Sequence, residues 1–235
     1  MRRSFVLAGL ILLGCGAGCQ PANHGPVVQV TRTPEFHPDS LKVVAFLGLG
    51  SSVPDPRAVP MMEPAIQRHL AAAKLRFVIL WPDEAERRVR ISGGEETYRA
   101  VRDYWRDSKK LDKFRAAELC RILDVDAILI GTVVDWLQTE ASPTSTQNPS
   151  TKVIASLSLY PEGASRPVWQ AQVSQTIEDT GRDADSGGDA YHHTARQREL
   201  ERSPQVQARE RGPGAPGFDE VVDIVAAELA KALAS

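Results

Sequence analysis

A glycine-rich segment, Gly48-Leu49-Gly50-Ser51-Ser52, is the part of the sequence most like a phosphate-binding loop. It follows an apolar run and precedes a helical pattern, where loop amides and a helix N-terminus can bind phosphate. However, it lacks the third glycine of the dinucleotide fingerprint and the Gly-Lys-Ser/Thr of the P-loop, and prolines separate it from the helix. We therefore predict an ordinary turn and no bound cofactor.

The histidines and serines offer no recognisable catalytic pattern. The pair His192-His193 could attract a metal ion, but no cysteine or histidine follows at ligand spacing, so we predict no metal site. No serine, cysteine or aspartate motif would place His69 in a triad, so we interpret it as a helix-surface residue. Ser51 and Ser52 lack the Gly-x-Ser-x-Gly elbow that exposes a nucleophile.

Two groups of carboxylates are also candidates for catalysis, because glycosidases act through paired carboxyl groups. Asp83, Glu84 and Glu86 follow one apolar run, and Asp124 and Asp126 flank another. These residues alternate with arginines, as solvated surface charge does. We therefore predict no catalytic residue and a protein that is not an enzyme.

The two cysteines near the N-terminus follow a segment with the pattern of a signal peptide. Arg2 and Arg3 precede the short apolar run 5–13, which is too short to span a bilayer but fits a signal peptide. Ile11-Leu12-Leu13-Gly14 before Cys15 resembles a bacterial lipobox, so we predict that Cys15 receives the lipid. Cys19, after Gly16-Ala17-Gly18, is the alternative acylation site. An ordinary cleaved signal peptide is the competing interpretation.

Charge and position then suggest where the mature protein resides. Removal of residues 1–14 leaves 26 basic and 30 acidic residues, a net charge of −4. No polybasic patch indicates nucleic acid as a partner. Neither Gly16 nor Gln20 is the aspartate that signals inner-membrane retention in many Gram-negative lipoproteins. We therefore expect an outer-membrane lipid anchor that leaves the protein facing the periplasm.

Composition and periodicity divide the rest of the chain. Residues 15–40 contain several prolines and no sustained period, which predicts a lipid-anchored tether. Residues 41–178 and 218–235 have the apolar patterns of one domain. Residues 179–217 are poor in large apolar side chains and rich in charge, which predicts a flexible insertion.

The apolar patterns of the domain alternate between strand and helix. Continuous apolar runs at 42–47, 76–81 and 126–134 predict buried strands, the last of which can continue through Trp136. Alternation at 152–160 and 168–177 predicts an antiparallel hairpin. Helical spacing predicts helices that end near 73, 106, 123 and 233, and residues 83–95 fit a short helix or an exposed loop.

These elements define an α/β fold. Right-handed crossovers make the first three strands parallel, and the hairpin extends the sheet in the antiparallel sense. We expect a single domain with one mixed sheet and helices packed on it. We also expect the closing helix, with Val222, Val225 and Leu229, to lie over Gly131 in the third strand.

Three segments together carry a family resemblance: KVVAFLGLG, AAKLRFVILWPDEAERRVR and LCRILDVDAILIGTVVDW. In this arrangement the chain resembles the envelope-lipoprotein superfamily that includes the curli-secretion lipoprotein, the lipoprotein activator of penicillin-binding proteins and the amino-terminal domain of TolB. The likeness spans residues 41–177. The shared motifs build the fold, and the chain lacks a long amphipathic segment that would line a secretion pore.

We therefore expect a non-enzymatic, membrane-anchored lipoprotein that acts as a docking or assembly factor in the cell envelope. Its expected partners are the membrane, through the N-terminal lipid, and an envelope protein; a homo-oligomer is also open. A subunit of a secretion or transport complex and a cell-wall hydrolase are the alternatives. An enzyme would depend on polar residues in a cleft, whereas a docking protein would depend on a surface patch.

Overall fold

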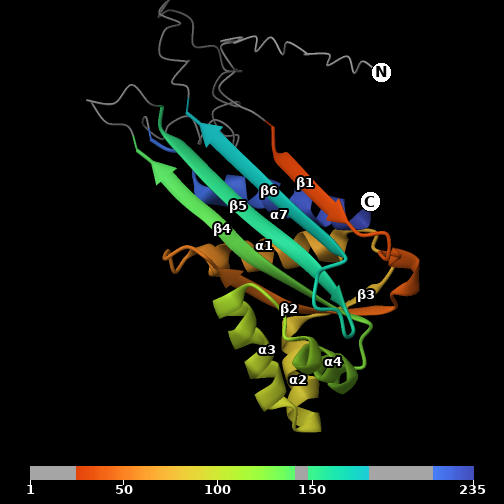
Figure 1. The fold of residues 1–235 in the computed structure, drawn as a ribbon. Helices are drawn as coiled ribbons and strands as arrows, with labels where there is room; N and C mark the ends of the chain where they lie inside the picture. The colour runs from red at the N-terminus through yellow and green to blue at the C-terminus, as the bar shows by residue number, and fades with distance from the viewer. Residues whose placement is uncertain (1–24, 141–147, 180–213) are drawn as a thin grey trace, which may run out of the picture.

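The computed structural model describes residues 25–140, 148–179 and 214–235. In these residues six strands and five α-helices form one domain (Figure 1). The strands are β1 (Val27–Arg32), β2 (Val43–Ser51), β3 (Val78–Leu80), β4 (Ala127–Thr139), β5 (Ser150–Pro161) and β6 (Trp169–Glu178). The helices are α1 (Ala58–Ala72), α2 (Pro82–Ser92), α3 (Glu95–Ser108), α4 (Lys113–Leu123) and α7 (Phe218–Ala234), and a 3-10 turn covers Pro38–Ser40.

The strands form a single sheet in the order β1-β6-β5-β4-β2-β3. β2 pairs in parallel with β3 and with β4, and the other neighbours are antiparallel. The predicted fold class is confirmed: a single-domain α/β fold in which an antiparallel hairpin extends three parallel strands.

Residues 83–95, for which the sequence predicted either a short helix or an exposed loop, include most of helix α2. Pro82 occupies its first turn, where a missing N–H costs nothing, and Gly93 ends it in the left-handed conformation (φ 72°). The next clear N-terminal signal belongs to α4, whose cap Asp112 accepts hydrogen bonds from the amides of Phe114 and Arg115.

Alternation along β2 divides the interior into two cores. Val44 and Phe46 face α1 and α7, whereas Ala45 and Leu47 face α2, α3 and α4. A bulge at Gly48 (φ 88°) then returns Leu49 to the first core. The first core extends across the sheet from β2 to β6, while the second lies under β3, β2 and the beginning of β4.

The helices α1 and α7 cover one face of the sheet, as Figure 1 shows. Phe218, at the start of α7, stacks on Trp136 of β4, with ring centroids 4.3 Å apart and planes 7° apart. Asp223 of α7 accepts a hydrogen bond from Arg68 of α1 and lies 2.8 Å from His69 Nε2. The predicted apolar side of the closing helix is buried: Phe218, Val221, Val222, Val225, Leu229 and Leu233.

The opposite face is covered only in part. In Figure 1, α2, α3 and α4 gather at the β2 end, and no described helix lies in front of β6 and β1. Most side chains of β5 and β6 on this face are hydroxyls and amides, including Ser156, Ser158, Gln170 and Gln172, although Lys152 and Ile154 also lie there. A broad polar surface of the sheet therefore remains open among the described elements.

Strand β1 corrects the predicted tether of residues 15–40. It pairs antiparallel with β6 from Val27↔Ser174 to Arg32↔Trp169, and Thr33 N–H donates to the carbonyl of Val168 (2.9 Å). Every residue of β1 is exposed, so backbone pairing rather than apolar burial holds it. The sequence carries no buried-face period for this reason, and the pattern was misinterpreted as a tether.

The predicted insertion also has different limits from those expected. The carbonyl of Pro216 accepts hydrogen bonds from Thr151 Oγ1 (2.5 Å) and Gln138 Nε2 (3.0 Å), and Asp179 N–H donates to the carbonyl of Pro149 (2.8 Å). Residues 179 and 214–217 thus contact the domain. The remainder of the predicted insertion, 180–213, lies outside the described residues.

Candidate functional site

Several residues proposed from the sequence lie outside the described part of the chain. These are both candidate acylation sites, Cys15 and Cys19, with the preceding signal peptide, and the pair His192-His193. Their roles stay predictions.

The glycine-rich segment is not a turn. Gly48 to Ser51 belong to β2, and the bulge is held by Glu63 of α1, whose carboxylate accepts a hydrogen bond from Leu49 N–H (2.9 Å). The prediction of an ordinary turn was wrong because the apolar run continues past the glycines, and a bulge absorbs Gly48. The hydroxyl of Ser51 donates to the carbonyl of Val53 (2.8 Å).

The other polar candidates have structural partners. The side chain of His69 is 26% exposed and meets Asp223, so it joins α1 to α7. Glu84 pairs with Arg87 and Arg88 on its own helix. Asp126 Oδ2 accepts from the amides of Lys42 (2.6 Å) and Val43 (2.9 Å), and these amide hydrogen bonds lower the pKa of that carboxyl.

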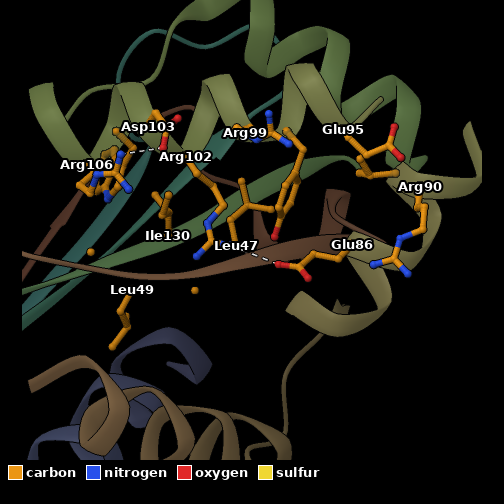
Figure 2. Close-up of a pocket in the computed structure, with 15 residues that line it drawn as sticks. Leu47, Leu49, Glu86, Arg90, Glu95, Arg99, Arg102, Asp103, Arg106 and Ile130 are labelled. Carbon is orange, nitrogen blue, oxygen red and sulfur yellow. Dashed lines mark hydrogen bonds and ion pairs between the residues drawn. The ribbon is translucent and has the colours of Figure 1, made fainter. Parts of the chain in front are cut away.

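A cavity of about 450 Å³ lies between α2, α3 and the bulge of β2. Figure 2 shows Arg99, Arg102 and Arg106 along one helix, with Glu86 and Arg90 on another. Apolar side chains form its inner wall: Leu47, Val89 and Ile130. Four arginines and three carboxylates line it, the latter being Glu86, Glu95 and Asp103.

Ion pairs neutralise only part of this charge. Arg102 contacts Glu86 (3.3 Å), and Arg106 contacts Asp103 (2.7 Å). Arg90 and Arg99 make no ion pair within the described ranges, and both are exposed. Glu95 also makes no ion pair within these ranges, so four arginines against three carboxylates leave the cavity an excess of one positive charge.

Tyr98 is the unsatisfied polar group of this cavity. The residue is only 7% exposed, and its hydroxyl has no hydrogen-bond partner among the described residues. Burial raises the pKa of Tyr98, against the opposing influence of Arg102, whose guanidinium lies 5.6 Å from the ring centroid. An unpaired buried hydroxyl costs about 1 to 3 kcal/mol, which a ligand with an acceptor would offset.

A second hollow, the sheet groove, follows the open face of the sheet. It has a volume of about 570 Å³ and extends from the end of α3 over β4, β5 and β6 to the β5–β6 turn. The side chains of Thr132, Ser156 and Ser158, which are at least 90% buried, lie in it. Three cations, Lys109, Lys110 and Arg166, line the groove, and no carboxylate does.

Neither hollow contains a familiar catalytic arrangement. In the described part of the chain, no serine or cysteine side chain hydrogen-bonds to a histidine ring. Cys120 is buried, and burial raises the pKa of its thiol to about 12, which keeps it protonated. Across residues 25–140, 148–179 and 214–235, no three histidine, cysteine, aspartate or glutamate side chains gather as metal ligands would. None of the helices in these ranges has the length and apolarity of a membrane span.

The sequence reasoning missed both hollows. The spacing of Arg99, Arg102 and Arg106 places three guanidinium groups on one side of α3, and this signal was available. The bulge of β2 and the position of α2, which complete the cavity, could not be inferred from periodicity alone.

Comparison with known proteins gave structural likeness alone. No family model and no curated protein matches the chain. The PelC dodecamer from Paraburkholderia phytofirmans is 16% identical, with 89% of this chain and 98% of that chain covered and a TM-score of 0.46. Lipoprotein GNA1162 from Neisseria meningitidis is 15% identical, with coverages of 72% and 98% and a TM-score of 0.42. These values establish neither a family nor a function for this chain, and the superfamily resemblance stays a prediction.

Proposed function

We propose that the protein is a lipid-anchored envelope lipoprotein without catalytic activity, which binds an envelope protein through the open face of its sheet. The observation that carries this proposal is the unequal covering of the sheet. Helices α1 and α7 close one face, while the sheet groove on the other presents hydroxyl and amide side chains. Such groups favour binding, because they can form hydrogen bonds with a partner.

The charge of the sheet groove supports a partner with an acidic surface. Lys110 and Arg166 form no ion pair within the described residues, and the groove lining contains no carboxylate. The protein as a whole is acidic, so this basic surface contrasts with its surroundings. The partner surface is therefore expected to be acidic, because complementary charge accelerates encounter and fixes orientation.

The expected location follows from the N-terminal sequence. Acylation of Cys15, or alternatively Cys19, would retain the domain at the membrane, and the absence of aspartate after either cysteine favours the outer membrane. A protein held there by lipid faces the periplasm. A docking role uses this geometry directly, because anchoring raises the local concentration of the sheet groove near membrane-bound partners.

Site-specific photo-cross-linking in cells tests the docking face. A photoreactive residue at Gln172, in the sheet groove, is expected to give an adduct of defined mass with one protein. The matched control places the photoreactive residue at Ala71, which is exposed on α1 on the other side of the sheet. It is expected to give no adduct.

Charge reversal distinguishes a specific adduct from proximity. Lys110→Glu combined with Arg166→Glu is expected to abolish the Gln172 adduct at unchanged protein level. An adduct that survives this double reversal, or that forms equally from Ala71, would overturn the proposed docking face.

A further inference from the structure

We propose that the arginine-lined cavity between α2, α3 and β2 binds a small carboxylate that carries an apolar group. This site is separate from the sheet groove and does not depend on the docking role. Its volume, about 450 Å³, lies within the range of pockets that hold small molecules, which is about 300 to 1,000 Å³.

The cationic part of the site is Arg102. This side chain is half-buried and extends from α3 toward β2, as Figure 2 shows. Its guanidinium contacts Glu86 through one nitrogen at 3.3 Å, so donors remain for a second carboxylate. Arg99, exposed one turn earlier on the same helix, supplies further positive charge at the rim.

The second observation is the hydroxyl of Tyr98. It is buried in the cavity lining and lacks a partner in the described part of the chain, whereas the nearby Trp105 indole N–H donates to the carbonyl of Gly131. A buried donor beside an arginine is suited to one oxygen of a carboxylate, while the guanidinium takes the other.

The apolar lining of the cavity favours a ligand that carries an apolar group beside its carboxylate. The side chains of Leu47, Val89 and Ile130 line the inner side of the cavity. An aliphatic or aromatic group there removes apolar surface from water, which inorganic phosphate or acetate cannot do. The site is therefore expected to prefer an amphipathic carboxylate to an inorganic anion.

Calorimetric titration of the full-length protein in lipid nanodiscs tests the site, with empty nanodiscs as the blank. The probe is 3-phenylpropanoate, and the controls are the neutral 3-phenylpropanol and inorganic phosphate. Saturable binding of the carboxylate, and weaker or absent binding of both controls, is expected. Absence of saturable carboxylate binding, or equal affinity for the alcohol, would overturn the proposal.

Single substitutions locate the binding. Arg102→Gln is expected to weaken binding roughly tenfold and Tyr98→Phe several-fold, because each removes a donor to the carboxylate. Tyr104→Phe, on the exposed side of the same helix, is the matched control and is expected to have no effect.

Glu86→Gln has the opposite expected sign. It frees Arg102 from its ion pair and removes the negative charge of Glu86, which repels the carboxylate of the ligand. The affinity for the carboxylate is therefore expected to rise several-fold. This variant decides the question even if Arg102→Gln does not fold. Unchanged or weaker binding in Glu86→Gln would contradict an Arg102-centred site.

Discussion

Gly131 occupies a point in the sheet where no side chain fits. A Cβ there would collide with Leu49 Cδ2, and it would lie 2.7 Å from Leu157 Cδ2 and 2.8 Å from the carbonyl oxygen of Ser156. The sequence suggested that the closing helix fills this space. The nearest atoms instead belong to β2 and β5, because their leucines converge over the glycine.

Replacement of Gly131 is therefore expected to destabilise the domain. Gly131→Val should lower the free energy of unfolding by about 1 to 3 kcal/mol through overpacking, since the Ser156 carbonyl belongs to the β4–β5 ladder and cannot move freely. Denaturant unfolding measures the change. Gly50→Ala is the control, because its Cβ would meet nothing closer than Trp105 Nε1 at 3.6 Å. An unchanged midpoint in Gly131→Val would refute the packing.

Asp126 gives the domain a pH dependence. Its carboxylate accepts from the Val43 and Lys42 amides, which lowers its pKa in the folded state. The stabilisation is therefore present above the unfolded pKa of about 3.9 and is lost as pH falls through the folded value. Asp126→Asn should cost about 1 kcal/mol at pH 7, a small figure because the group is solvent-exposed.

The measurement for Asp126 is denaturant unfolding of the wild type and Asp126→Asn between pH 7 and pH 2. The stability difference should shrink as the pH falls. A difference that persists unchanged at pH 2 would show that the charge of Asp126 contributes nothing.

The secondary structure was predictable wherever burial imposes a period. The runs at 42–47 and 126–134 are near-continuously apolar because both faces of β2 and β4 are covered, and these strands were correctly predicted. Strand β3 is shorter than its apolar run, because Trp81 already caps helix α2. Strand β1 was missed, since an edge strand held by its backbone leaves no apolar signature.

Helix α3 shows why the arginine-lined cavity could not be predicted from the sequence. Tyr98, Val101 and Trp105 recur at helical spacing in the sequence, and all three are buried. Their neighbours Arg99 and Arg102 face a cavity that exists only because β2 bulges at Gly48 and α2 packs opposite. Periodicity identifies the inner side of a helix, but a concave site depends on distant segments.

For the whole molecule, β1 changes the relation between domain and membrane. If Cys15 carries the lipid, the linker ends at Val27 rather than near residue 40. A fully extended chain between these residues reaches about 40 Å at most. The domain would thus remain close to the bilayer, and partners of the sheet groove would have to lie within that distance.

Lipid anchoring through Cys15 is the central claim about this protein's function, and mass spectrometry of the N-terminus tests it most directly. The mature wild-type protein should begin at Cys15 with diacylglycerol on the thiol, and Cys15→Ala should remain an unacylated precursor. Incorporation of labelled fatty acid into Cys15→Ala, with loss from Cys19→Ala, would move the site to Cys19. A mature N-terminus that carries no lipid would contradict the membrane-anchored lipoprotein itself.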